Sequence, residues 1–305
     1  MPDKIRCRVL TGPTGAGKTE LALRIAEENR WDIICMDSMQ IYRRMDIGTA
    51  KPTKEEQTRV THHMVDIIEP EASFSVSQYR DQAEAIIREL AKAGREALFV
   101  GGTGLYLEAM IHPMAMGSAP ANPERRAELK RLAETEEGKK ALHSILETLD
   151  PQTAERLPIN DVRRTIRAIE VTENTGIPFS RQPAREEDSP FEWTMVSLTM
   201  EREKLYRRIN QRVTRMIELG LKEEVAGLLR DGVPEDAQSM SGIGYRQMIP
   251  CVHGETSTEE AAEEIRLASR HYAKRQMTFL RRIPEVIYLD AEDPGTEQKM
   301  KEVMR

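Results

Sequence analysis

The eight residues GPTGAGKT, at positions 12–19, follow directly on the apolar stretch CRVL and precede the amphipathic stretch ELALRIAEE. They match the phosphate-loop pattern GxxxxGK[ST], whose context is a strand before the loop and a helix after it. Glycines allow successive backbone amides to point at one anion, and the helix adds its positive N-terminal end. The stretch therefore predicts a phosphate-binding loop at the edge of a parallel α/β sheet. The alternative is a glycine turn without a ligand.

Every residue of the loop is expected to border the bound phosphates, with Lys18 placing its charge on the terminal phosphate and Thr19 offering a hydroxyl to Mg²⁺. The loop consists of Gly12, Pro13, Thr14, Gly15, Ala16, Gly17, Lys18 and Thr19.

Short apolar runs alternate with helical patterns in the first hundred residues, which is typical of βαβ units. The predicted strands are residues 7–11, 32–36 and 97–101, and the runs WTMVSL and EVIYL, at 193–198 and 285–289, complete a sheet of about five strands. Long helices are predicted at 77–93, 201–219 and 258–282. The fold class is thus α/β, a P-loop core with helices flanking a parallel sheet.

Residues 113–190 contain no convincing strand, but Asn122, Asp150 and Asn160-Asp161 each mark a helix start. Proline-rich stretches at 112–123 and 179–190 bound this part of the chain and are suited to be hinges. We therefore expect residues 1–112 and 191–305 to form the core and residues 113–190 to form a helical insertion domain.

The composition of the 305 residues, 39% hydrophobic and 31% charged, is that of an ordinary globular protein. No apolar run approaches the roughly 20 residues of a membrane helix, and the first residues do not resemble a signal peptide, so no membrane partner and a cytoplasmic location are expected. The three cysteines are far apart in sequence and are expected to be buried, and the adjacent histidines at 62–63 lack the spacing of a zinc site. The net charge of −6 argues mildly against a nucleic-acid partner, unless basic side chains cluster locally.

A phosphate loop most often holds ATP or GTP, which makes a nucleotide-dependent small-molecule kinase one hypothesis. The third predicted strand, however, runs into LFVGGTGLY without a carboxylate that could hold Mg²⁺, and only Asp37 follows the second strand. A non-catalytic RNA-binding module is another hypothesis.

Seven stretches, in order along nearly the whole chain, resemble the tRNA dimethylallyltransferase family: GPTGAGKT, DSMQIYRRMDIGTAKP, HHMVDI, VGGTGLY, NDVRRTIRAIEV, SGIGYRQM and AKRQMTFLRR. The resemblance implies transfer of a dimethylallyl group from dimethylallyl diphosphate to N6 of the tRNA adenosine immediately 3′ of the anticodon (position 37), with release of pyrophosphate. It also implies that the loop holds a prenyl diphosphate with Mg²⁺ at Thr19, and that the anticodon stem-loop is the partner. A monomer is our expectation.

The resemblance gives Asp37 the role of the base that takes the proton of the adenine amine, Thr103 a contact to the target nucleotide, and Arg212 a contact to the diphosphate. For Asp37 two alternatives stay open: it holds Mg²⁺ through a water molecule, or it only caps the end of its strand. Arg208 and Arg215 lie near Arg212 on one stripe of a predicted helix, and a solvated face is their alternative.

Basic residues cluster locally in two predicted helices. Arg163, Arg164 and Arg167 crowd the start of one helix of the insertion, and Arg266, Arg270, Lys274 and Arg281 form a stripe on the last long helix. The glycine-rich segment at 240–245 is expected to serve the close approach of a nucleotide rather than packing. With the residues that the resemblance adds, the expected tRNA contacts are Asp37, Ser38, Met39, Gln40, Thr103, Arg126, Asp161, Val162, Arg163, Arg164, Thr165, Met240, Ser241, Gly242, Ile243, Gly244, Tyr245, Lys274 and Arg281.

Overall fold

The computed structural model of the chain describes residues 4–111, 122–182 and 190–305, so the central parts of both proline-rich stretches lie outside the described residues. The chain divides into two compact units. One unit joins Met1–Ile111 to Pro190–Arg305 and is here called the core unit, and the other is His112–Ser189, the insertion. Each is described by itself.

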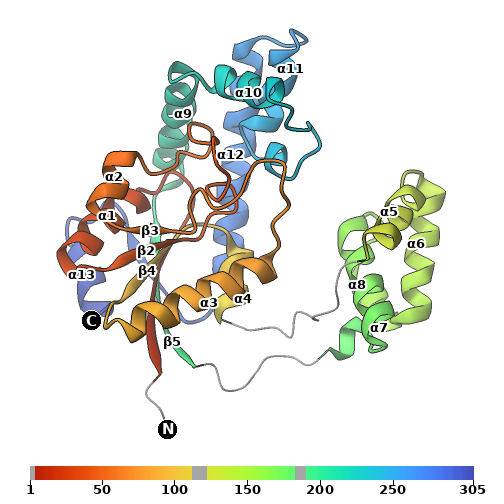
Figure 1. Cartoon of the computed structure of the whole chain (residues 1–305), viewed down its shortest axis with the longest axis horizontal. Coiled ribbons are helices and arrows are strands. Elements are labelled where there is room, and N and C mark those ends of the chain that lie inside the picture. The colour runs from red at the N-terminus through yellow and green to blue at the C-terminus, as the bar shows by residue number, and fades with distance from the viewer. Residues whose placement is uncertain (1–3, 112–121, 183–189) are drawn as a thin grey trace. The chain divides into compact units, whose positions relative to one another are not determined.

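The core unit is built on a parallel sheet of six strands in the order β3-β2-β4-β1-β5-β6 (Figure 1). The strands are β1 (Ile5–Thr11), β2 (Asp32–Cys35), β3 (His62–His63), β4 (Ala97–Val100), β5 (Phe191–Thr199) and β6 (Val286–Asp290). The predicted parallel α/β sheet is confirmed, with one strand more than the five expected. That strand, β3, has only two residues, too few to show any periodicity in the sequence.

Successive residues of the central strand β1 point to opposite faces of the sheet and enter two different hydrophobic cores. Val9 packs with α3 (Val76–Lys92) and α4 (Gly104–Ile111), whereas Leu10 packs with α1 (Lys18–Asn29) and α13 (Thr296–Val303). Because both faces are covered, the strands read as continuous apolar runs. The remaining elements of the unit are α2 (Lys54–Arg59), α9 (Arg202–Glu218), α10 (Leu221–Arg230), η2 (Ser239–Ser241), α11 (Tyr245–Val252) and α12 (Thr258–Leu280).

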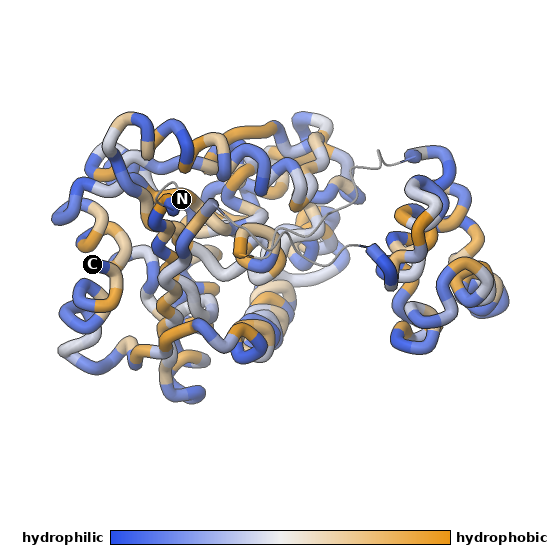
Figure 2. The backbone as a smooth tube through the Cα atoms, turned by 90° about the horizontal axis from the view of Figure 1, so that it is seen from below, coloured by the Kyte–Doolittle hydropathy of each residue, from blue (hydrophilic) through white to orange (hydrophobic). Residues whose placement is uncertain are grey.

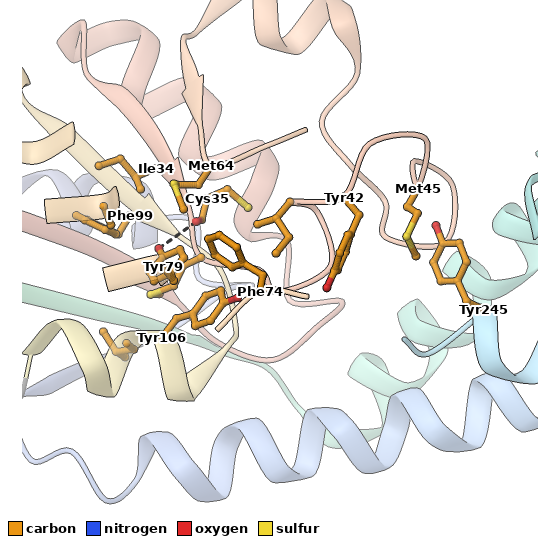
Figure 3. Close-up of a cluster of buried hydrophobic side chains, with 14 of the residues drawn as sticks. Ile34, Cys35, Tyr42, Met45, Met64, Phe74, Tyr79, Phe99, Tyr106 and Tyr245 are labelled. Atoms are coloured by element: carbon orange, nitrogen blue, oxygen red, sulfur yellow. Dashed lines mark hydrogen bonds between the residues drawn. The ribbon is translucent and has the colours of Figure 1, made fainter. Parts of the chain in front are cut away.

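Several aromatic side chains lie in the larger of the two cores, part of which Figure 3 shows in close-up. The rings of Tyr79 and Tyr106 stack with their centroids 3.8 Å apart. The Tyr79 hydroxyl donates a hydrogen bond of 3.0 Å to the carbonyl of Cys35, the last residue of β2. This buried bond ties α3 to the carboxyl end of the sheet, where the phosphate loop lies.

The insertion is helical, as predicted, with α5 (Pro123–Leu132), α6 (Glu136–Leu149), α7 (Pro151–Arg156), α8 (Val162–Thr175) and the short η1 (Phe179–Arg181). Asn122, Asp150 and Asp161 cap three of these helices through their side chains, and Thr135 caps α6, a start that the sequence analysis did not identify. The insertion has a hydrophobic core of its own, which includes Leu142, Leu146 and Ile169. The predicted helical nature of this part of the chain follows from caps and periodicity alone.

Hydrophobic and hydrophilic positions alternate along the helices of both units (Figure 2). Among the described residues, no helix combines the length and apolarity needed to cross a bilayer. The three cysteines are free thiols and are buried, as expected.

The carboxyl ends of β2 and β4 approach so closely that residue 101 has no room for a side chain. A Cβ atom on Gly101 would lie 2.1 Å from the carbonyl oxygen of Met36. The amide of Met36 donates to the Val100 carbonyl at 2.8 Å, and the amide of Gly101 donates to the Leu10 carbonyl at 3.2 Å. Both bonds would have to move to admit a methyl group.

We predict that Gly101→Ala lowers the free energy of unfolding by about 1–3 kcal/mol, the typical cost of an overpacked site. Gly227→Ala is the matched control, because Gly227 lies inside α10 and its added Cβ would meet only the end of the Arg230 side chain, at 3.7 Å. That change should raise stability by about 0.5–1 kcal/mol. Urea unfolding measures both, and equal stabilities of the two variants would contradict the close approach.

Candidate active site

The phosphate loop lies between β1 and α1, as predicted. Its glycines Gly12, Gly15 and Gly17 all have positive φ angles, of 130°, 85° and 92°. Gly17 is the N-cap of α1 and therefore supplies no side-chain cap to the first turn. The amides of that turn have no acceptor within the helix, so they are available to an anion.

Lys18 and Arg212 converge on the loop from two elements. The Lys18 ammonium donates to the carbonyls of Gly12 and Pro13 at 2.8 and 2.9 Å. Arg212, on α9, donates to the Thr14 hydroxyl at 3.1 Å and to the Thr49 carbonyl at 3.3 Å. Burial, reinforced by the charge of Arg212, lowers the pKa of Lys18 to about 7 against the opposing effect of Asp37. Lys18 and Arg212 are thus two neighbouring basic groups that are shielded from solvent, and this environment favours the binding of an anionic ligand.

Two cavities meet beside this loop. The first, of about 330 Å³, is bordered by the phosphate loop, Arg208 and Gln276. The second, of about 270 Å³, is bordered by Ser38, Met39 and the segment after η2. Four residues border both cavities and are called the junction residues below: Thr14, Asp37, Arg212 and Tyr272.

Asp37 and Thr103 follow the neighbouring strands β2 and β4 and lie at the same edge of the sheet. One carboxylate oxygen of Asp37 accepts the amide of Met39 at 2.8 Å, and the Thr103 hydroxyl accepts the amide of Ser38 at 3.1 Å. The capping role considered for Asp37 is therefore present, but it uses one oxygen. No hydrogen bond from the described residues reaches the other oxygen, which remains available for proton transfer.

The segment between Asp37 and β3 is held by two charged side chains that the sequence analysis did not identify, the buried Lys51 and the partly buried Glu224. Lys51 donates to the Tyr42 carbonyl at 2.7 Å and to the carboxylates of Asp46 and Asp66, both at 2.6 Å. Glu224, on α10, accepts three consecutive backbone amides, those of residues 46–48, at 2.9, 2.8 and 3.2 Å. These bonds place the Thr49 carbonyl against Arg212.

Gln276 and Tyr272 on α12 are site residues that the sequence analysis also missed. Gln276 accepts the Thr14 amide and donates to the Gly102 carbonyl, both at 2.9 Å. The Tyr272 hydroxyl interacts with the side chains of Thr103 and Gln276, and its pKa rises to about 12, mainly through burial. The spacing of four residues, which puts both side chains on one face of a helix, was the signal in the sequence.

The expectation that residues 240–245 serve a nucleotide rather than packing is wrong for two of them. The side chains of Met240 and Tyr245 are fully buried in the larger core, and the Tyr245 hydroxyl donates to Glu224 at 2.6 Å. The ring of Tyr245 fills the space that a side chain on Gly48 would need, so Tyr245 is a core residue. Ser241, Gly242 and Ile243 border the second cavity, and the amide of Gly244 begins α11 by donating to Gln247.

In the insertion, several expected tRNA contacts have partners within their own unit. Arg126 forms two bonds of 2.7 Å to the buried carboxylate of Glu170. Asp161 caps α8 and pairs with Arg164 at 3.0 Å. Thr165 is 1% exposed, so its side chain lies on the inner face of α8 and packs within the insertion. Val162 packs against the core of the insertion.

Of the expected basic stripes, only parts are free to bind a partner. Arg266 pairs with Glu263, Arg270 donates to Asn210 at 3.0 Å, and Arg215 pairs with Glu218 at 3.6 Å. Lys274 and Arg281 are exposed, as is Arg163 in the insertion. Within the described ranges, no ion pair joins any of these last three side chains.

The described residues contain no cluster of three or more His, Cys, Asp or Glu arranged to hold a metal ion. His63 instead contacts the carboxylate of Asp32 at 2.7 Å, and His62 the carbonyl of Val60 at 2.7 Å. Thr19 and Glu20 border the first cavity beside the loop. This donor set fits a Mg²⁺ ion that takes most of its other ligands from phosphate oxygens and water.

We predict that binding of inorganic pyrophosphate takes up about one proton at pH 8, because an anion restores the charged form of a Lys18 side chain that is mostly neutral there in the free protein. The affinity should therefore weaken as the pH rises above about 7. Calorimetry in buffers of different ionisation enthalpy measures the uptake. Lys18→Met should show no such proton uptake. Lys18→Arg, which stays charged, should bind pyrophosphate without taking up a proton. Equal uptake by the wild type and Lys18→Met would assign the proton to another group.

Comparison with known proteins places this site in a family. Residues 40–283 match the family model described as IPP transferase. A protein of Pelotomaculum thermopropionicum named tRNA dimethylallyltransferase is 46% identical over 286 residues, which span 93% of this chain and 90% of the relative. The crystal structure of the tRNA isopentenylpyrophosphate transferase of Bacillus halodurans, 40% identical, superposes with a TM-score of 0.73 over 99% of this chain and 95% of that one. A eukaryotic dimethylallyltransferase acting on tRNA, 23% identical with a TM-score of 0.82 over 98% of this chain and 77% of that one, shares the fold. The chain belongs to the IPP transferase family.

Proposed function

We propose that this protein transfers the dimethylallyl group of dimethylallyl diphosphate to N6 of the tRNA adenosine immediately 3′ of the anticodon and releases pyrophosphate. The observation that carries the proposal is the junction of the two cavities. A cationic cavity suited to a diphosphate and a second cavity share Asp37 and Arg212, so a group held in one can react with a group held in the other. Membership of the IPP transferase family favours this reaction over the kinase alternative.

The phosphate loop, Lys18 and Arg212 bind the diphosphate. Negative charge grows on the diphosphate as the allylic C–O bond breaks, and fixed cations and amides stabilise it most at that moment. Arg212 is anchored on Thr14 at 3.1 Å, so its guanidinium is oriented before the donor arrives. Arg208 borders the same cavity and adds a third cation. When bound at Thr19, Mg²⁺ supplies further charge neutralisation.

Asp37 accepts the proton of the adenine amine. The lone pair of this amine is delocalised into the ring, so removal of the proton as the N–C bond forms helps the attack. The adenosine leaves its stack to enter the second cavity, as in other enzymes that act on a base. Thr103, adjacent to Asp37 through the amide of Ser38, contacts the flipped nucleotide.

In the core unit, the tRNA contacts the exposed basic residues Lys274 and Arg281 and the segment 241–243. In the insertion, the exposed residue for such a contact is Arg163. We propose that the enzyme acts as a monomer. A tRNA substrate supports a cytoplasmic location.

Incubation with labelled dimethylallyl diphosphate and tRNA tests the proposal directly. Label in the RNA, located at the adenosine 3′ of the anticodon by nuclease digestion, is the expected result. Phosphorylation of a small acceptor with labelled ATP would favour the kinase alternative, and RNA binding without transfer would favour a binding module.

For Asp37→Asn we expect near-normal binding of both substrates and a turnover reduced by about 10² to 10⁴-fold, because the amide keeps the size but takes no proton. Single-turnover transfer at several Mg²⁺ concentrations measures the effect. If Asp37 instead acted by holding Mg²⁺, excess Mg²⁺ would restore much of the rate. A variant with the full rate at ordinary Mg²⁺ would exclude the role of base.

Replacing Lys274 or Arg281 by Ala should weaken tRNA binding and lower the salt dependence of log K by up to about one unit per lost phosphate contact. The Michaelis constant for the prenyl donor should stay the same. Lys299→Ala, which removes an exposed lysine of α13, is the control and should leave the salt dependence unchanged. If all three variants had the same salt dependence of tRNA binding, Lys274 and Arg281 would be solvated surface residues without a phosphate contact.

A further inference from the structure

One neutral side chain connects the two loops that hold the reacting groups. Gln276 accepts the amide of Thr14 in the phosphate loop and donates to the carbonyl of Gly102, both at 2.9 Å. The side chain is 6% exposed, and its two partners lie 262 and 174 residues away in the sequence. Because both partners are backbone groups, the carboxamide fixes the loops themselves rather than particular side chains.

The chain makes room for this bond at residue 102. A Cβ atom on Gly102 would lie 2.1 Å from Nε2 of Gln276, so a side chain there would displace the amide. A carboxamide satisfies both loops at any pH, since it accepts with one atom and donates with the other. An ionised glutamate would accept the Thr14 amide but place a second oxygen against the Gly102 carbonyl.

The two hydrogen bonds of Gln276 connect it to the residues proposed to bind the leaving group and to those beside the proposed base. Thr14 also receives Arg212, the proposed diphosphate ligand, on its hydroxyl. Gly102 precedes Thr103, whose hydroxyl accepts the Ser38 amide next to Asp37. A shift between the loops therefore changes the separation of the leaving group from the base.

We propose that Gln276 is a positioning residue for prenyl transfer, which holds the diphosphate loop and the Thr103 turn at the separation that aligns leaving group, allylic carbon and amine. This inference rests on the proposed function. A misplacement of about 1 Å at a reacting centre costs on the order of 10²-fold in rate. The loop that binds each substrate would itself stay intact, so each substrate would still bind. Loss of Gln276 therefore affects the rate of transfer far more than the affinity for either substrate.

Two variants test the role. Gln276→Met keeps the length of the side chain and removes both bonds, and its single-turnover rate should fall about 10²-fold. The dissociation constants for inorganic pyrophosphate and for tRNA should each stay within about threefold. Gln276→Glu should be impaired to a similar degree at pH 8.

Lowering the pH should rescue the Gln276→Glu variant, because a protonated carboxyl, like the carboxamide, offers one acceptor and one donor. Burial against the Gly102 carbonyl favours this neutral form, although Lys18, Arg208 and Arg212 border the same cavity and oppose it, and Asp37 favours it. The rate of the variant divided by that of the wild type should rise between pH 8 and pH 5.5. Dividing by the wild-type rate removes the effects of pH that are the same in both proteins.

Gln238→Met is the matched control, because Gln238 makes the same pair of bonds to the backbone of Phe74, at 3.0 and 2.9 Å, outside the two cavities. It should lower the unfolding temperature without changing the single-turnover rate. A full rate in Gln276→Met, a rate loss matched by an equal loss of both affinities, or a pH-independent ratio for Gln276→Glu would each overturn the positioning role. A wild-type protein that transfers no label would instead overturn the proposed function, and the inference with it.

Discussion

The site depends on how closely the carboxyl ends of β2 and β4 approach each other. The Met36 carbonyl occupies the space of a side chain at residue 101, so the two strands end in direct backbone contact. Asp37 follows immediately on one side and Thr103 lies two residues further on the other. Their proximity therefore results from the sheet and does not require a flexible loop to bring them together. A site built on rigid backbone keeps the reacting groups aligned at little entropic cost.

The same edge of the sheet explains how a phosphate loop can serve a group transfer whose donor is not a nucleoside triphosphate. The loop supplies amides and a lysine to whatever phosphate it holds, and the other residues around it decide the chemistry. Here a cation from α9, Arg212, and a carboxylate that follows β2, Asp37, border both cavities. In the proposed reaction, the charge that develops on the diphosphate and the proton that leaves the amine are thus handled by neighbouring groups.

Local signals in the sequence were enough for the layout of the fold but not for the contacts that complete the site. The phosphate loop, the longer strands and the helix caps at Asn122 and Asp150 are each encoded within a few residues, and the structure has them where the sequence predicts. The glycine-rich local pattern around Tyr245 was misleading, because its burial against Gly48 depends on distant segments. Gln276 and Glu224 were missed for a related reason: both bind backbone amides, and nothing in their own neighbourhoods shows which loop the fold brings to them.

The helix α12 combines two functions because its two faces point to different surroundings. Tyr272 and Gln276 are four residues apart and face the cavities, whereas Lys274, about 200° around the helix from Gln276, is exposed. Arg281, seven residues after Lys274, returns to the exposed side. Because α12 is one continuous helix of 23 residues, a partner that fixes the position of its outer face also fixes the residues on its inner face. In the proposed complex, RNA phosphates bind this outer face, and part of their binding energy can be used to hold the two hydrogen bonds of Gln276 in the geometry of the transition state. Contacts remote from a reacting centre raise its rate in this way.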